Sequence, residues 1–138
     1  MASLIYNSFF EDLARGVIDL DTDTFKCLLV TSAYVESKDA HLKRSDVTGE
    51  VAGVGYTAGG AAVSLTVAKD LVNDRLDVTL GGFSLSNATV MARKAVYYKS
   101  RGGLATADEL VAVIDFGADV TSTAAAWTLA ASILRVQN

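Results

Sequence analysis

A glycine-rich stretch is the part of this sequence that most resembles a ligand-binding motif. Gly53, Gly55, Gly59 and Gly60 stand close together, as in loops that hold phosphate groups. Such a loop follows a buried strand and precedes a helix, whose N-terminal N–H groups bind the anion. Here a charged segment, residues 36–50, precedes the glycines, a strand-like alternating run follows them, and no Gly-Lys-Ser/Thr triplet is present. The pattern therefore favours glycines that permit positive φ at a tight entry into a strand.

Three aspartates alternate in a second stretch that resembles part of a calcium loop. Asp19, Asp21 and Asp23 match the first three ligand positions of such a loop. A calcium loop then needs glycine at its sixth position and glutamate at its twelfth, where this chain has Thr24 and Val30. A solvated turn between a helix and a strand is the favoured interpretation, and weak cation binding stays open.

The remaining candidates for chemistry are single residues. His41 is the only histidine, which excludes a multi-histidine metal site, and its charged surroundings indicate a solvated loop. Cys27 is the only cysteine and lies in an apolar run, where a thiol is inert, so a Cys27–His41 nucleophile pair is disfavoured. Asp115, at the end of an apolar strand, has no recognisable paired acid. We therefore expect no enzymatic activity, no cofactor and no metal site.

One helix is expected near the N-terminus, over residues 8–15. Ser8 and Glu11 have the spacing of a capping box, in which each side chain satisfies a backbone N–H of the first turn. Gly16 stands where a left-handed residue would end the helix. We expect residues 1–16 to form an N-terminal arm and helix, with Ala2 to Phe10 exposed and able to reach a neighbouring subunit.

The rest of the chain predicts strands. Residues 36–50 are expected to form a surface loop with a helical turn near residues 45–50, and Asn73-Asp74 to form a turn. Seven or eight short apolar or alternating runs, about ten residues apart, are typical of an antiparallel sandwich or barrel. The main runs are residues 25–31, 63–68, 76–80, 83–85, 90–98, 110–116 and 127–133. We predict a single all-β domain over residues 1–138.

Composition limits the classes of partner. The chain has 138 residues, 51% of them hydrophobic and 20% charged, and a net charge of −4, which indicates a globular protein. This charge provides no basic face for nucleic acid or for an anionic membrane. The first residues do not form a signal peptide, and no run approaches the ~20 apolar residues of a membrane span. With a single cysteine no intramolecular disulfide can form, and a cytosolic origin fits best.

Aromatic residues supply the candidates for a protein interface. Phe25, Phe83, Phe116 and Trp127 are expected in the core. Adjacent strand residues point to opposite faces, so Tyr97 and Tyr98 are not both expected in one sheet's core, and one is predicted to be available for a partner. A surface tyrosine without a partner is the equally weighted alternative. The predicted interface residues are Tyr6, Phe9, Phe10, Tyr56, Tyr97 and Tyr98.

Several motifs together resemble a family of small virion proteins of tailed bacteriophages. They are YNSFFEDLARGVIDLDTDTFKCLLVTSAY, RSDVTGEVAGVGYTAGG, NDR, SNAT, ARKAVYYK and VAVIDFG, which cover residues 6 to about 117 in order. The match is weakest after Thr121. The motifs are structural and indicate no chemistry.

The resemblance implies a capsid decoration, or cement, protein with a β-sandwich of jelly-roll type and a short N-terminal helix. Such a protein would bind the outside of the phage major capsid protein shell, hold neighbouring subunits together, and be assembled in the host cytoplasm. Lattice symmetry favours a homodimer at two-fold positions with an interface above roughly 1,000 Å². The alternatives are a tail, neck or baseplate component of the same fold, or a carbohydrate-binding module on the virion.

Overall fold

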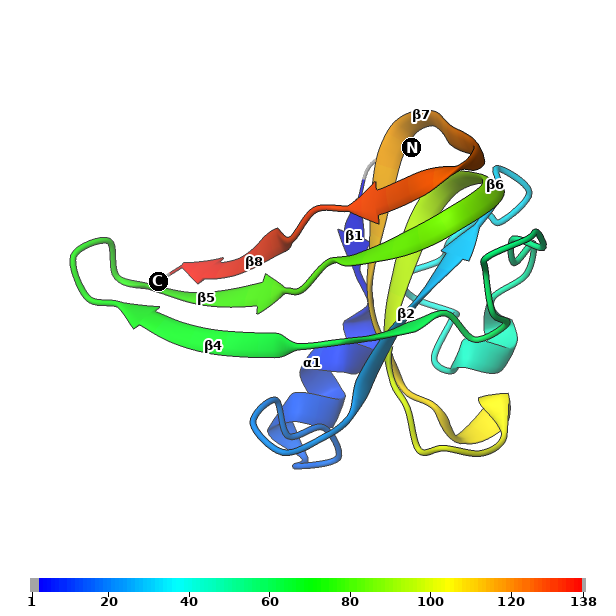
Figure 1. Cartoon of the computed structure of the whole chain (residues 1–138). Helices are drawn as coiled ribbons and strands as arrows, with labels where there is room; N and C mark the ends of the chain where they lie inside the picture. The colour runs from blue at the N-terminus through cyan, green and yellow to red at the C-terminus, as the bar shows by residue number, and fades with distance from the viewer. Residues whose placement is uncertain (1–2, 138) are drawn as a thin grey trace.

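The computed structural model describes residues 3–137, which form one α-helix and two antiparallel sheets (Figure 1). The larger sheet has the strand order β1-β7-β6-β2-β3, and the smaller has the order β4-β5-β8. The prediction of a mostly β, antiparallel fold with a short N-terminal helix is confirmed. The elements are β1 (Leu4–Ile5), α1 (Asn7–Ala14), β2 (Phe25–Val30), β3 (Ala61–Val63), β4 (Leu65–Asp70), β5 (Arg75–Leu80), β6 (Phe83–Lys99), β7 (Leu110–Leu129) and β8 (Ser132–Gln137), with 3₁₀ turns at Arg44–Asp46 and Ala105–Ala107.

Helix α1 begins differently from the expected capping box. Tyr6 is the N-cap residue and supplies no side-chain cap, while Ser8 lies inside the helix. Within the described chain the Ser8 hydroxyl has no hydrogen-bond partner, and Glu11 instead pairs with Arg15 at 2.8 Å. The predicted capping box is therefore wrong. Gly16, at φ +74°, follows the helix in the left-handed conformation, as predicted.

The larger sheet is covered on both faces, with β2 near its centre. Cys27 and Leu29 of β2 lie in a core that also takes in the smaller sheet and α1. Leu28 and Val30 point to the opposite face, into a second core. The loop between β2 and β3 covers this second core, to which Tyr34 contributes. The prediction of a buried strand over residues 25–31 is confirmed, and the helical turn expected at residues 45–50 is the 3₁₀ turn at Arg44–Asp46.

The two sheets are joined by one bent, two-stranded ribbon. β6 and β7 pair from Tyr98 opposite Leu110 to Phe83 opposite Leu129, and β5 and β8 then pair from Leu80 opposite Ser132. The chain passes between the sheets at residues 81–82 and 130–131. In Figure 1 the smaller sheet projects to the left of the larger one, with α1 beneath it. We call β4, β5 and β8 the projecting sheet, and residues 71–74, which join β4 to β5, its tip.

Candidate interaction surface

Most of the predicted interface aromatics are buried within this chain. Tyr6, Phe9, Tyr97 and Tyr98 are each at most 2% exposed. Tyr97 and Tyr98 do point to opposite faces, as predicted, but each face carries a core, so the expectation that one of them is available for a partner is wrong. These four side chains are fixed by the fold of the single chain.

The other two predicted residues differ from each other. Tyr56 is half-buried; its hydroxyl donates to Glu50 Oε2 at 2.7 Å and accepts from the Leu29 N–H at 3.0 Å. Phe10 is 46% exposed on α1. Of the six predicted residues, Phe10 is therefore the one whose side chain is open to solvent.

The N-terminal segment is part of the larger sheet and does not extend freely. Leu4 and Ile5 pair with Val113 and Ala112 of β7, and the Tyr6 N–H donates to the Val111 carbonyl. The expectation of an exposed arm over Ala2 to Phe10 is thus wrong from Leu4 to Phe9, and Ala2 lies outside the described residues.

The glycine-rich stretch packs against its own chain. A Cβ on Gly53 would lie 2.2 Å from the Thr89 carbonyl oxygen, and one on Gly60 would lie 1.9 Å from that of Cys27. The Gly59 N–H donates to Glu50 Oε2 at 2.7 Å, so this amide is already occupied. Strand β3 follows directly. The structural interpretation of these glycines is confirmed, because they allow positive φ and close backbone contact at the entry into a strand.

The single residues considered for chemistry have structural contacts. Burial raises the pKa of the Cys27 thiol, which is fully buried. His41 is not simply solvated as expected: its ring stacks on Tyr34, and its Nδ1 lies 2.9 Å from the Tyr34 hydroxyl. Asp23 pairs with Lys99 at 2.8 Å, and Asp115 lies 3.5 Å from Arg93.

Over residues 3–137 no three His, Cys, Asp or Glu side chains are grouped so that they could hold a metal ion. None of the helices described is both long enough and apolar enough to cross a membrane.

Two buried ionic networks were not visible from the sequence. Lys94 and Glu36 form an ion pair at 2.6 Å beside the second core. At the β6–β7 turn, Arg101 binds Glu109 with Nε–Oε1 at 2.7 Å, and Arg44 pairs with Asp108 at 2.7 Å. Burial raises the pKa of Glu109, but the hydrogen bond from Arg101 and the neighbouring cations outweigh it and lower this pKa below its usual value. The first network holds a loop onto β6, and the second joins the 3₁₀ turn at Arg44–Asp46 to the β6–β7 turn.

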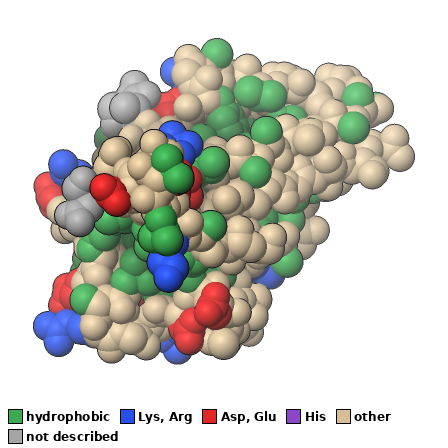
Figure 2. Space-filling view, turned by 90° about the vertical axis from the view of Figure 1, so that its left-hand side faces the viewer, with side chains coloured by type: hydrophobic (Ala, Val, Ile, Leu, Met, Phe, Trp, Pro, Cys, Tyr) green, Lys and Arg blue, Asp and Glu red, His purple; other side chains and the backbone are tan. Residues whose placement is uncertain are grey.

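The projecting sheet has an apolar face that continues beyond the core. The strand registers place Leu65, Leu80 and Val78 on this face near the body, where they are buried. Farther out, Val136 is 52% exposed on the same face. The tip residues Leu71 and Val72 are 80% and 92% exposed. Figure 2, viewed from the side on which this sheet projects, shows hydrophobic side chains between charged ones.

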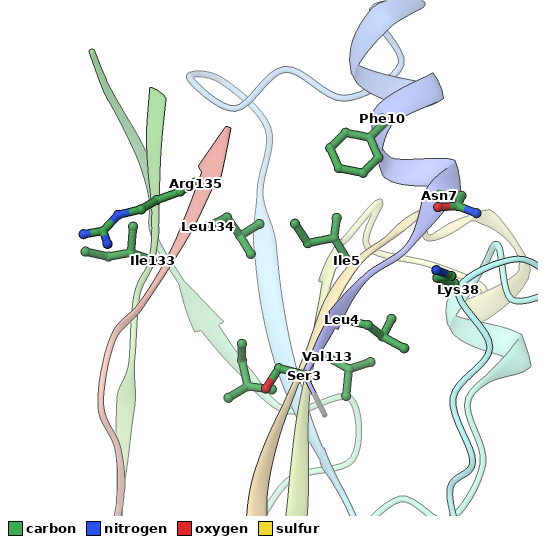
Figure 3. A pocket seen from close by; sticks show the side chains of 11 residues that line it. Ser3, Leu4, Ile5, Asn7, Phe10, Lys38, Val113, Ile133, Leu134 and Arg135 are labelled. Carbon is green, nitrogen blue, oxygen red and sulfur yellow. The ribbon is translucent and has the colours of Figure 1, made fainter. Parts of the chain in front are cut away.

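A groove of about 530 Å³ lies where the projecting sheet meets the body, and we call it the β8 groove. Figure 3 shows Ile5, Phe10 and Leu134 directed into the space between β1, α1 and β8. The charged side chains among the described residues lining it are Lys38 and Arg135, both cationic. Arg135 lies across β8 from Leu134 (Figure 3) and pairs with Asp77 at 3.1 Å.

Sequence reasoning missed the tip and the β8 groove. Leu71 and Val72 lie between two predicted strands, beside the predicted Asn73-Asp74 turn, and their sequence position alone does not show that they form an exposed tip. Phe10 was identified, but its partners Ile5 and Leu134 lie about 130 residues apart in sequence, and no local pattern brings them together.

Comparisons with protein-family models, curated proteins and solved structures give no match to this chain.

Proposed function

We propose that this protein is a non-enzymatic structural component of a tailed-bacteriophage virion, which binds the outside of the capsid and holds neighbouring major capsid protein subunits together. The sequence resemblance over residues 6 to about 117 supplies this role, and with it the jelly-roll topology. The structural observation that best supports it is the projecting sheet, with the exposed apolar residues Val136, Leu71 and Val72.

Large exposed apolar patches on a folded chain mark interaction sites. The projecting sheet reaches away from the body, so it can contact a second molecule without changing the cores. Contacts of this kind depend on complementary surfaces, and they stabilise the bound partner by mass action. A partner that binds only the assembled lattice stabilises each site by RT ln(1 + [L]/Kd), about 2.7 kcal/mol at a hundredfold excess over Kd.

A carbohydrate-binding module is less well supported. Sugar sites of that kind use exposed aromatic side chains on one face, and among residues 3–137 Phe10 is the aromatic residue with an exposed side chain. A tail, neck or baseplate component would use the same projecting sheet and differs mainly in copy number.

The test is co-sedimentation of the purified protein with capsids of the phage that encodes it, before and after expansion. We expect saturable binding to expanded capsids and hundreds of copies per virion by quantitative mass spectrometry. About a dozen copies or fewer, found in the tail fraction, would indicate a tail component and not a component of the capsid shell. The absence of this chain from purified virions would overturn the proposal.

A further inference from the structure

The tip of the projecting sheet combines apolar and acidic side chains. Leu71 and Val72 are almost fully exposed, and Asp70 and Asp74 flank them. Asp70 is occupied by hydrogen bonds from residues 72 and 73 and by Arg75. Within the described chain, Asp74 has no ion pair, so an aliphatic pair with a free carboxylate beside it is presented to solvent.

The β8 groove has the complementary character. Its apolar surface includes Phe10, which is half-exposed, and Ile5 and Leu134 (Figure 3). Lys38 lies at its edge and, over residues 3–137, makes no ion pair through its side chain. A segment with two aliphatic residues and a carboxylate therefore matches this groove in polarity and charge. The tip of the projecting sheet is such a segment.

The spacing of the tip and the groove within one chain permits a closed pair. Leu134, on the groove wall, is paired with Val78, and the tip begins beyond Arg75 at the end of the same strand. The four residue-to-residue steps from Val78 to Asp74 span about 14 Å of extended chain. If two copies lay with their projecting sheets antiparallel about a two-fold axis, each tip would reach the groove of the other, and Val136 would lie between the two contacts.

We infer that the projecting sheet is a dimerisation element: the Leu71–Val72 tip of each copy inserts into the β8 groove of a second copy, with Asp74 facing Lys38. This is an isologous contact, so it closes at two copies and does not produce filaments. The inference concerns this chain alone. It can therefore fail while capsid binding holds, and capsid binding can fail while the dimer forms.

Sedimentation equilibrium from micromolar to near-millimolar concentration is the first test. We expect the mass to rise from 14.5 kDa towards twice that value. Replacing both Leu71→Ser and Val72→Ser should raise the dimer dissociation constant at least tenfold. The matched control replaces Val54→Ser and Leu104→Ser, which are 72% and 75% exposed but lie away from the projecting sheet, and should leave it unchanged. A monomer at every concentration would overturn the inference.

A mixing experiment tests which surfaces meet. The groove variant Phe10→Glu should dimerise as weakly as the tip variant. A mixture of the two retains one intact tip–groove contact, so it should associate more tightly than either variant alone. In the same way, Asp74→Lys should weaken the dimer and Lys38→Asp in the same chain should restore it. A wild-type dimer that tolerates the tip and groove substitutions, or mixtures that associate no better than the single variants, would show that the copies meet elsewhere. Circular dichroism of each variant establishes that it is folded.

Discussion

The Lys94 ammonium lies 2.6 Å from Glu36 Oε2, and both residues are more than nine-tenths buried. The same Nζ donates to the Tyr34 carbonyl at 2.8 Å and lies 5.9 Å from the centre of the Tyr34 ring. Desolvation of the two charges is costly, and their mutual attraction and hydrogen bonds offset it. The pair therefore attaches the loop after β2 to the middle of β6, over the second core.

Removal of one partner of this pair should lower the free energy of unfolding much more than removal of both. We expect Lys94→Met to lower the free energy of unfolding by about 3–5 kcal/mol, because it leaves the Glu36 carboxylate buried without its cation. The double variant Lys94→Met, Glu36→Leu should recover most of that loss. Urea unfolding followed by circular dichroism measures both. If the single variant is no less stable than the double variant, the pair is not buried in solution.

The second ionic network should make stability depend on acid pH. The pKa of Glu109 is lower in the folded chain than in the unfolded chain, where a glutamate titrates near 4.3. Its stabilising contribution is therefore complete above that value and is lost as pH falls through the folded-state pKa. Thermal unfolding between pH 7 and pH 3 should show the loss. Glu109→Gln should cost about 1–3 kcal/mol at neutral pH and reduce the slope of stability against pH.

A matched control for that variant is Glu11→Gln. Glu11 also binds an arginine, Arg15 at 2.8 Å, but both side chains are more than 60% exposed. An exposed pair of this kind contributes about 0.3–0.5 kcal/mol. The stability of Glu109→Gln will still depend on acid pH, because Asp46 contributes in the same way. Hydrogen bonds from the Leu42 and Lys43 backbone also lower the pKa of Asp46. An equal slope in wild type and Glu109→Gln would show that Glu109 does not contribute.

Local periodicity predicted most strand residues and the direction of their side chains. It did not predict that residues 83–99 and 110–129 are continuous strands, or what covers them. Alternation correctly placed Tyr97 and Tyr98 on opposite faces of β6. Whether both faces are buried depends on the segment containing Tyr34, which is about 60 residues earlier and returns over the sheet. That contact is set by tertiary packing, so the sequence pattern alone gave the wrong exposure.

The candidate interaction surface could not be predicted from the sequence for a related reason. The alternating run that became β4 and β5 was predicted, as was the turn at Asn73-Asp74. The outward position of these strands depends on the pairing of β5 with β8, at the far end of the chain. In helix α1, Gly16 follows the end of the helix as expected, whereas the helix starts after Tyr6, a residue of the second core, and not at the predicted capping box.

Cys27 should be unreactive in the folded protein. Its side chain is fully buried in β2, and burial raises the pKa of its thiol, so almost no thiolate exists at neutral pH. We expect no modification by iodoacetamide at pH 8 in buffer and complete modification in denaturant, measured by intact mass. Rapid labelling of the native protein would show that β2 opens frequently and would contradict the burial of this strand between the two cores.

Gly82 should be the residue on which the junction between the two sheets depends. It lies between β5 and β6, and a Cβ at this position would lie 1.9 Å from the Leu129 carbonyl oxygen, so the ribbon would have to separate there. Gly82→Ala should cost about 1–3 kcal/mol, as other overpacked sites do. It should also weaken self-association, because it displaces the projecting sheet relative to the β8 groove. Gly103→Ala is the control: a Cβ there meets nothing within 4 Å, so stability should be unchanged or slightly increased. Thermal unfolding measures the stability of the two variants, and sedimentation measures their self-association. Equal stability and self-association in Gly82→Ala and Gly103→Ala would contradict the close approach at Gly82.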